Sequence, residues 1–410
     1  MYAMDNPFDG KAVLIIGAGL LQIPAIKRAR ELGLHTIATD YNPEAPGLDL
    51  ADDRIIISTR DVDGTVRKAR QYARTRRRID GVLTVGTDAS MTVAAVANAL
   101  DLPGIKFSNA EAASNKLKMR ARFREHGVPI PEFFECWTEE EALAHFRELA
   151  CPAVIKPADN MGARGVSLAV TEEEVRRAFT FAKAASPSGE VIIEEYMEGP
   201  ELSIDALVYR SEVHITGIAD RIIDAPPYFV ETGHIMPSAL PAAQLDDAVR
   251  VMRAGIKALG ITMGAAKGDI KVTPQGAKVG EIAARLSGGF MSAYTYPYAT
   301  GVDLIGNAVR IALGLPPQEL DPRHDRVAME GALIPGPGRV RAISGIDRAL
   351  ALPGVRHVFI NVAIGDTLVV PRSNVEKAGH VIVEAADRET AIGLVEESRR
   401  LILFELEQQG

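Results

Sequence analysis

Two carboxylates, Asp269 and Glu281, lie on short apolar segments that are separated by the turn-forming sequence Thr-Pro-Gln-Gly of residues 273–276. Segments rich in Val and Ile on both sides of such a turn are typical of a β-hairpin, which brings the two acids side by side. Two carboxylates without a basic partner between them repel each other, and a divalent cation usually offsets that cost. Oxygen ligands suit Mg²⁺ or Mn²⁺, which bind through one or two carboxylates together with substrate phosphates.

Arg285 follows Glu281 by four residues, and its guanidinium can face the same phosphates as a fixed cation. The hairpin therefore predicts a site for a metal ion and a phosphorylated substrate. The alternative is a surface hairpin whose two acids are solvated.

A second group of candidates lies around residues 159–165, DNMGARG, where Gly162, Ala163 and Gly165 make a loop of small residues between two predicted strands. Such a loop can lay backbone N–H groups against phosphate oxygens and then move. It is not a P-loop, because no Gly-Lys-Ser/Thr follows, and a plain mobile hairpin is the alternative. Lys156 ends the strand before the loop, and a lysine at the end of a buried strand needs an anionic partner.

Polar residues on both sides of this region complete the set. Lys116 lies in an ordinary polar helix start, where a solvated surface lysine is the simpler interpretation. Glu194 and Met197 lie at the end of a strand, and Glu201 follows a Gly-Pro turn. A carboxylate there can hold a ribose diol, and extended backbone can pair with an adenine edge. Acidic residues on a surface turn are the commoner case.

The composition limits the classes of protein. The chain has 410 residues, of which 47% are hydrophobic and 24% charged, and its net charge is −8. These values predict a soluble globular protein of two or three domains and argue against general nucleic-acid binding. The apolar run of residues 12–21 is too short to span a membrane, and the two cysteines give no disulfide framework. We therefore expect a cytoplasmic protein without a membrane or nucleic-acid partner.

The elements that must position these residues alternate between strands and helices. Apolar runs at residues 12–16, 36–39, 55–58 and 81–85, with helices between them that include residues 66–78, predict a doubly wound α/β domain. Further along, a strand-loop-strand-helix-strand pattern predicts a small α+β subdomain. The end of the chain mixes short strands with a final helix over residues 389–407.

Taken in order, these features resemble the ATP-grasp superfamily over roughly residues 12–315. The most specific segments are AVIKPADNMGARGVSL, VIIEEYMEGPELSID and the hairpin with its EIAARLSGG end. The resemblance implies an N-terminal Rossmann-like pre-ATP-grasp domain at residues 1–112 and an ATP-grasp domain at 113–327. Its lid subdomain would span about 129–197, and a C-terminal α+β domain would span 328–410.

In that family ATP lies between two α+β subdomains, which implies roles for the candidates. Lys116 and Lys156 would contact the phosphates, and the loop that contains Gly162, Ala163 and Gly165 would close over them. The remaining implied roles are adenine contacts by Glu194 and Met197, a ribose contact by Glu201, Mg²⁺ binding by Asp269 and Glu281, and stabilisation of the transferred phosphoryl group by Arg285.

The chain departs from the family pattern at two positions. Ala283 stands where an Asn ligand is common, and Asp269 is shorter than the usual Glu, so one of two metal ions is in doubt. The E-x-A-A-R form is most like the L-amino acid ligases. The segment FVETGHIMPS of residues 229–238 also resembles that subgroup.

By this resemblance Glu231 and His234 would line the acceptor side of the site. A satisfied loop histidine is the alternative for His234. Ser287, Gly288 and Gly289 would present backbone N–H groups to a substrate carboxylate.

The glycine turn GAGLLQIP suggests a dinucleotide fold, but Gln22 replaces the third glycine of the fingerprint. We expect this turn to bind no dinucleotide and to border the carboxylate substrate. An NAD-dependent oxidoreductase is accordingly a minor alternative.

The predicted reaction joins a small-molecule carboxylate to an amine through an acyl phosphate, with ATP consumed to ADP; amino acids are the expected substrates. Arg285 and Lys156 are the predicted catalytic residues. The rivals are an ATP-grasp carboxylase or formyltransferase that acts on a purine precursor, a biotin carboxylase and a non-catalytic ATP-binding protein. The oligomeric state is left open, with a homodimer as one expectation because many relatives are dimers.

Overall fold

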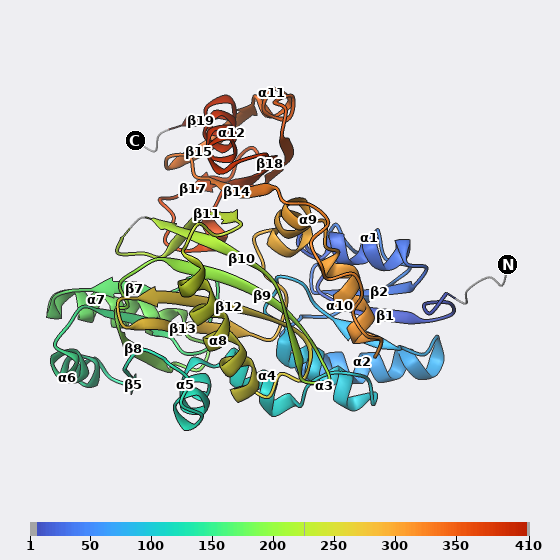
Figure 1. Cartoon of the computed structure of the whole chain (residues 1–410), viewed down its shortest axis with the longest axis horizontal. Helices are drawn as coiled ribbons and strands as arrows, with labels where there is room; N and C mark the ends of the chain where they lie inside the picture. The colour runs from blue at the N-terminus through green and yellow to red at the C-terminus, as the bar shows by residue number, and fades with distance from the viewer. Residues whose placement is uncertain (1–5, 225, 408–410) are drawn as a thin grey trace.

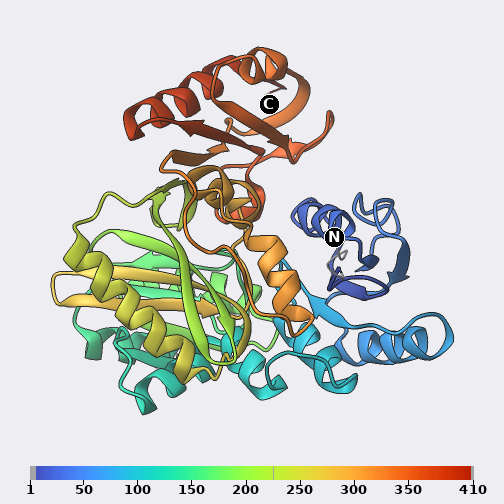
Figure 2. The same ribbon diagram turned by 45° about the vertical axis from the view of Figure 1, so that its right-hand side comes forward.

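The computed structural model describes residues 6–224 and 226–407. Residues 1–5 of the predicted N-terminal domain, residue 225 and residues 408–410 of the predicted C-terminal domain lie outside the described part. Figure 1 shows the N-terminal residues in blue, the central residues in green and yellow, and the C-terminal residues in red above them. Turned by 45°, the blue part stands apart from the central sheet, with α10 (Leu304–Ala312) between them (Figure 2).

The N-terminal part is a parallel four-stranded sheet in the order β3-β2-β1-β4, which confirms the predicted doubly wound fold. Its elements are β1 (Ala12–Ile16), α1 (Ile23–Glu31), β2 (His35–Asp40), β3 (Asp53–Ile56), α2 (Val62–Thr75), β4 (Gly81–Leu83) and α3 (Ser90–Ala99). Alternate side chains of β1 pack toward α1 and toward α2 and α3, so both faces of the sheet are covered. Helix α2 begins four residues earlier than predicted because Asp61 caps it by accepting from the N–H of Gly64.

Two helices, α4 (Phe107–Ser114) and α5 (Lys116–Glu125), lead to a second sheet, which is antiparallel and has the order β5-β8-β6-β7. Its elements are β5 (Phe133–Cys136), α6 (Glu139–Leu149), β6 (Ala153–Pro157), β7 (Ser167–Ala169), α7 (Glu172–Ala185) and β8 (Val191–Glu195). Helices α6 and α7 each begin with a capping box, from Thr138 to Glu141 and from Thr171 to Glu174. The predicted strand-loop-strand-helix-strand pattern is β6-loop-β7-α7-β8.

The largest sheet has eight strands in the order β13-β12-β9-β10-β11-β14-β18-β16. Its first five strands are β9 (Glu201–Tyr209), β10 (Glu212–Asp224), β11 (Val230–Met236), β12 (Met263–Thr273) and β13 (Gly276–Ala283), and its nearby helices are α8 (Ala242–Ala258), η1 (Met291–Thr295) and α9 (Tyr296–Thr300). Strands β12 and β13 form the predicted hairpin, and Asp269 lies opposite Glu281. Alternate residues of β9 pack in the core that contains α4, α5 and α8, which leaves Glu201 and Asp205 on the other face.

The C-terminal strands β14 (Val327–Leu333), β16 (Val355–Ile360) and β18 (Gly379–Ala385) extend this sheet, because β14 pairs with β11. The predicted boundary at residue 328 thus lies inside one continuous sheet. The other C-terminal elements are β15 (Gly338–Ser344), α11 (Ile346–Leu350), β17 (Thr367–Leu368), η2 (Asn374–Glu376), α12 (Arg388–Leu401) and β19 (Leu403–Glu407).

The prediction of one final helix over residues 389–407 is wrong in its second half. Helix α12 ends at Leu401, and β19 then pairs with β15. The alternation in LFELE explains the change, because Phe404 and Leu406 pack against the small core beside β15 while the glutamates face outward. No helix in the described part of the chain is both long and apolar enough to cross a membrane.

Candidate active site

A cavity of about 650 Å³ lies where the N-terminal part, the small antiparallel sheet, the central sheet and the C-terminal strands meet. All predicted site residues except Gly165 line it: Lys116, Lys156, Gly162, Ala163, Glu194, Met197, Glu201, Glu231, His234, Asp269, Glu281, Arg285, Ser287, Gly288 and Gly289. Gly165 has a positive φ of 76°, and a Cβ there would lie 2.5 Å from the Cβ of Ala185. Its place is therefore in the packing of the loop against α7.

Lys156 has the anionic partner that its position required. Its Nζ lies 2.6 Å from Oε2 of Glu194, and Nε of Arg120 lies 2.7 Å from Oε1 of the same carboxylate. Burial would raise the pKa of Glu194, but Arg120 and Lys156 lower it to about 2. The result is an ionised carboxylate between two cations, at the junction of the small sheet and α5. Arg120 was not predicted from the sequence.

The two acids of the hairpin have cationic partners, so the expectation that they lack them was wrong. Lys267 donates to Asp269, and Nζ of Lys116 lies 3.5 Å from Oε2 of Glu281. The period of two along β12 explains the first contact, since it places Lys267, Asp269 and Lys271 on one face. Burial acts to raise the pKa of Glu281, but nearby lysines, Lys116 first, lower it, so the carboxylate is ionised.

These carboxylates fit a metal ion that arrives with a phosphorylated ligand. Asp269 and Glu281 offer oxygen ligands from adjacent strands, which is the donor type that Mg²⁺ prefers. Within residues 6–224 and 226–407 no cluster of three or more His, Cys, Asp and Glu could hold a metal ion. The remaining ligands would therefore come from phosphate oxygens and water.

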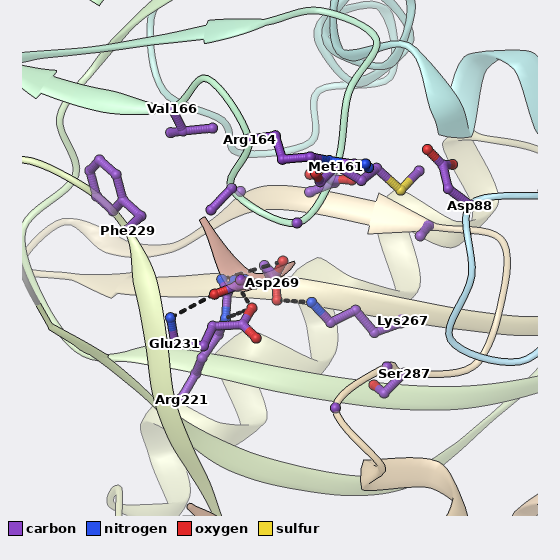
Figure 3. A pocket seen from close by; sticks show the side chains of 18 of the residues that line it. Asp88, Met161, Arg164, Val166, Arg221, Phe229, Glu231, Lys267, Asp269 and Ser287 are labelled. Atoms are coloured by element: carbon purple, nitrogen blue, oxygen red, sulfur yellow. Dashed lines mark hydrogen bonds and ion pairs between the residues drawn. The ribbon is translucent and has the colours of Figure 1, made fainter. Parts of the chain in front are cut away.

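Arg221 on β10 joins three of the carboxylates in the cavity (Figure 3). It donates to Glu201 and Glu231, and its Nη1 lies 3.4 Å from Oδ2 of Asp269. Burial alone would lower the pKa of Arg221, but these acids raise that pKa well above its ordinary value. No local sequence pattern indicates this role, because Arg221 and its partners lie on four different strands.

The loop after Arg285 is anchored by Asp205, a buried residue of β9. Oδ1 of Asp205 accepts from the N–H of Ser287 at 3.2 Å and from its hydroxyl at 2.7 Å, and Oδ2 accepts from Ser292 at 2.9 Å. The N–H of Ser287 is therefore already used, contrary to its predicted role toward a substrate. No described residue accepts from the N–H groups of Gly288 and Gly289. Burial raises the pKa of Asp205 to about 6, although the hydrogen bonds from the two serines act to lower it.

Residues outside the predicted set also line the cavity. The C-terminal part supplies Asn374, Lys377 and His380, and the N-terminal part supplies Asp88. The N–H of Asn374 donates to the carbonyl of Gly162 at 2.9 Å, and its Oδ1 accepts from the N–H of Glu231 at 2.8 Å. The C-terminal part thus contacts both the small-residue loop and β11.

At the glycine turn, Gln22 fills the space beside Gly17, and its Nε2 donates to the carbonyl of Val85 at 2.6 Å. Leu20 and Leu21 of the same turn line the cavity. The turn therefore faces the cavity with apolar side chains.

Two family models match this chain. The model described as ATP-grasp domain matches residues 149–293, and the L-amino acid ligase C-terminal domain 2 matches residues 332–407. The chain is similar to an uncharacterized protein, y4rH, of Sinorhizobium fredii, with 28% identity over 381 residues that cover 90% of this chain and 78% of that one. It is also similar to the carbamoyl phosphate synthase large chain of Methanosarcina acetivorans, with 24% identity over 80% of this chain, but it spans only 33% of that protein.

Solved structures share the fold. The crystal structure of L-amino acid ligase from Bacillus licheniformis aligns with a TM-score of 0.83 and 23% identity, covering 97% of this chain and 99% of that one. Phosphoribosylglycinamide synthetase from Anaerococcus prevotii aligns with a TM-score of 0.76 and 21% identity over 97% of this chain and 100% of its own. The chain therefore carries an ATP-grasp domain at residues 149–293 and the C-terminal domain 2 of L-amino acid ligases at residues 332–407, and it shares the fold of these solved structures.

Proposed function

We propose that this ATP-grasp ligase joins the carboxylate of one amino acid to the amine of another and consumes ATP. One observation carries the proposal: residues of the C-terminal L-amino acid ligase domain and the paired-carboxylate hairpin of the ATP-grasp domain line the same cavity. A phosphate-activating site and an acceptor site so close together suit a two-step condensation.

In the first step, a carboxylate oxygen of one substrate attacks the γ-phosphorus of ATP, and ADP leaves with the electron pair of the broken P–O bond. In the second step, the amine attacks the acyl carbon, and phosphate leaves. Lys116 and Lys156 would hold phosphate oxygens, with Gly162 and Ala163 in the loop above them. Glu194 and Met197 would meet the adenine, and Glu201 would meet the ribose.

Asp269 and Glu281 would hold Mg²⁺ or Mn²⁺, which would supply positive charge to the phosphates. Because Ala283 offers no side-chain ligand, one tightly held ion is the simpler arrangement.

Arg285 has donors free for an anionic oxygen. Its Nη1 donates to the carbonyl of Leu286 at 3.0 Å, and its Nη2 lies 3.7 Å from Sδ of Met161. Its buried Nε has no hydrogen-bond partner among the described residues. A half-buried guanidinium whose buried Nε–H is unused is expected to bind an anion, which supports its role toward the transferred phosphoryl group.

The amine-side substrate would lie against Glu231 and His234. A substrate carboxylate would meet the N–H groups of Gly288 and Gly289, which have no acceptor among the described residues. Small-molecule substrates are the proposed partners. A homodimer stays a prediction from the resemblance, and sedimentation of the purified protein tests it.

The deciding experiment measures phosphate release from ATP and Mg²⁺ with the twenty amino acids, singly and in pairs, and with bicarbonate in a separate reaction. Release that requires one particular pair supports the ligase and identifies both substrates. Release with bicarbonate alone favours the carboxylase alternative. ATP binding without any release contradicts a catalytic role on these substrates.

A further inference from the structure

The acceptor side of the cavity contains a cluster of two histidines around one glutamate, contributed by three adjacent strands. Oε2 of Glu330 on β14 lies 3.0 Å from Nδ1 of His234 on β11, and Oε1 lies 2.5 Å from Nδ1 of His380 on β18. The side chain of Glu330 is fully buried, whereas His234 and His380 line the cavity with 3% and 6% of their surface exposed. One carboxylate, which does not line the cavity itself, therefore holds both imidazoles in position.

The arrangement determines which ring nitrogen faces the cavity. Burial would raise the pKa of Glu330, but the hydrogen bonds from His234 and His380 lower it far below its ordinary value, so the carboxylate is ionised. An ionised carboxylate only accepts hydrogen bonds, so each imidazole presents its Nδ1–H to Glu330. Each Nε2 then carries a lone pair when the ring is neutral. Neither Nε2 has a hydrogen-bond partner among the described residues, and Nε2 of His234 lies 4.0 Å from Glu231, too far for a hydrogen bond.

Several charged groups and one aromatic ring lie close to the cluster. Arg221 on β10 lies opposite His234 in the sheet register, and Glu231 precedes it on β11. Lys377 donates to the carbonyl of Glu231 at 3.1 Å and, together with Arg399 of α12, interacts electrostatically with Glu330. The ring of Phe290 lies edge-on to His380 with the ring centroids 5.4 Å apart. Two buried imidazoles with free nitrogens in a charged pocket call for a ligand that exchanges protons.

The second chemical step of the proposed reaction releases protons that some group must accept. An amine enters as an ammonium ion, which must lose one proton before its lone pair can attack the acyl carbon. The nitrogen must lose another proton as the amide forms. Phosphate leaves with the electron pair of the broken C–O bond.

We propose that His234 and His380 accept the two protons of the amine through their Nε2 atoms, and that Glu330 is the positioning residue that holds both rings. This inference rests on the proposed ligase function. Glu330 keeps the Nε2 lone pairs of both rings directed toward the cavity, and it stabilises each imidazolium when it forms. His380 belongs to the C-terminal part, so the inference gives that part a role in the chemistry.

The test compares two nucleophiles on the same acyl phosphate. Hydroxylamine is uncharged at neutral pH and traps the intermediate as a hydroxamate without help from a base, whereas an amino acid amine arrives protonated. We expect His380→Gln, His234→Gln and Glu330→Gln to lower amide formation about 100-fold and to leave hydroxamate formation within about twofold of wild type. Amide synthesis by the histidine variants should recover as the pH rises toward the pKa of the substrate's own amino group, because uncharged amine then enters.

Matched controls lie on the same sheet. Glu384→Gln on β18 and His357→Gln on β16 change residues that do not line the cavity, and both reactions should be unchanged in these variants. If Glu330→Gln does not fold, the two histidine variants decide the question.

Three results would overturn the inference. Amide formation that is unaffected in both histidine variants excludes proton transfer through them. Equal losses of amide and hydroxamate, with no recovery at high pH, assign a purely structural role to the cluster. A wild-type protein that forms no hydroxamate with any of the twenty amino acids contradicts the ligase function itself, which is a different failure from the other two.

Discussion

At the scale of single residues, the acids of the hairpin have a proposed metal-binding role and also form ion pairs within the protein. Asp269 and Glu281, the proposed metal ligands, lie opposite each other on adjacent strands, and Lys267 and Lys116 already neutralise part of their charge. In the free protein these lysines stabilise two close carboxylates. When a nucleotide binds, the same lysines can turn to its phosphates, so the site stays near neutrality in both states.

We expect Glu281→Ala and Asp269→Ala each to reduce turnover at least about 100-fold, equivalent to about 2.7 kcal/mol of barrier. Phosphate release with the active substrate pair, measured over a range of Mg²⁺ concentrations, checks this. Glu212→Ala, an exposed acid at the start of β10 outside the cavity, is the control. Near-normal turnover of the Glu281 variant at low Mg²⁺ would remove the metal assignment.

Asp205 predicts a pH dependence of stability. Its pKa is raised in the folded protein from 3.8 to about 6, so the folded state binds the proton more tightly than the unfolded state. The free energy of unfolding should therefore fall as the pH rises from about 4 to about 6, by at most about 3 kcal/mol.

Urea unfolding between pH 4 and pH 7 measures this slope. Asp205→Asn keeps the size of the side chain and can still bond to Ser287 and Ser292, but it does not titrate. The variant should lose this component of the slope, and a profile identical to that of wild type would show that Asp205 is not its source.

At the scale of elements, the loop between β6 and β7 depends on a glycine that does not line the cavity. Gly165 has φ of 76°, and an added Cβ would lie 2.5 Å from the Cβ of Ala185 and 3.2 Å from Pro157. Gly165→Ala thus combines left-handed strain with overpacking against α7, and each costs about 1–2 kcal/mol.

Gly189 is the matched control, because its φ is 80° but no atom lies within 4 Å of an added Cβ. We expect Gly165→Ala to lower the Tm by more than Gly189→Ala, and the difference isolates the packing against α7. Equal shifts in calorimetry would mean that the loop relaxes around the methyl group and that only backbone strain matters.

At the scale of the whole molecule, the C-terminal part is not a separable appendage. Strand β14 pairs with β11, and His234 of β11 is held by Glu330 of β14. The same sheet therefore carries the proposed acceptor side of the cavity, and the domain boundary predicted from the sequence lies within it.

A chain that ends at residue 326 would leave β11 as an unpaired edge strand beside a large apolar surface. We expect this truncation to aggregate or to lose its cooperative unfolding transition, which light scattering and thermal denaturation measure. A soluble, cooperatively folding fragment that still binds ATP would instead show that β14 and the strands beyond it are dispensable for the nucleotide site.

The sequence by itself determined the local features. Apolar runs ending in glycine turns placed β1 and its helix, and the turn at residues 273–276 set Asp269 opposite Glu281. These features depend on neighbours within a few residues, where backbone preferences and periodicity act directly. The resemblance of ordered motifs then gave the ATP-grasp fold and fifteen residues that the structure gathers around one cavity.

Only the tertiary structure decided which charges meet. Arg221 binds Glu231 ten residues away and lies beside Asp269, and Glu330 joins His234 to His380 across residues far apart in the chain. Glu330 is the only charged residue in the apolar strand VAMEGAL, which is a local sign of a buried acid but does not identify its partners. The switch from α12 to β19 also required β15 as a pairing partner. Hydrogen bonds and ion pairs between distant strands depend on sheet order, which a single sequence does not encode locally.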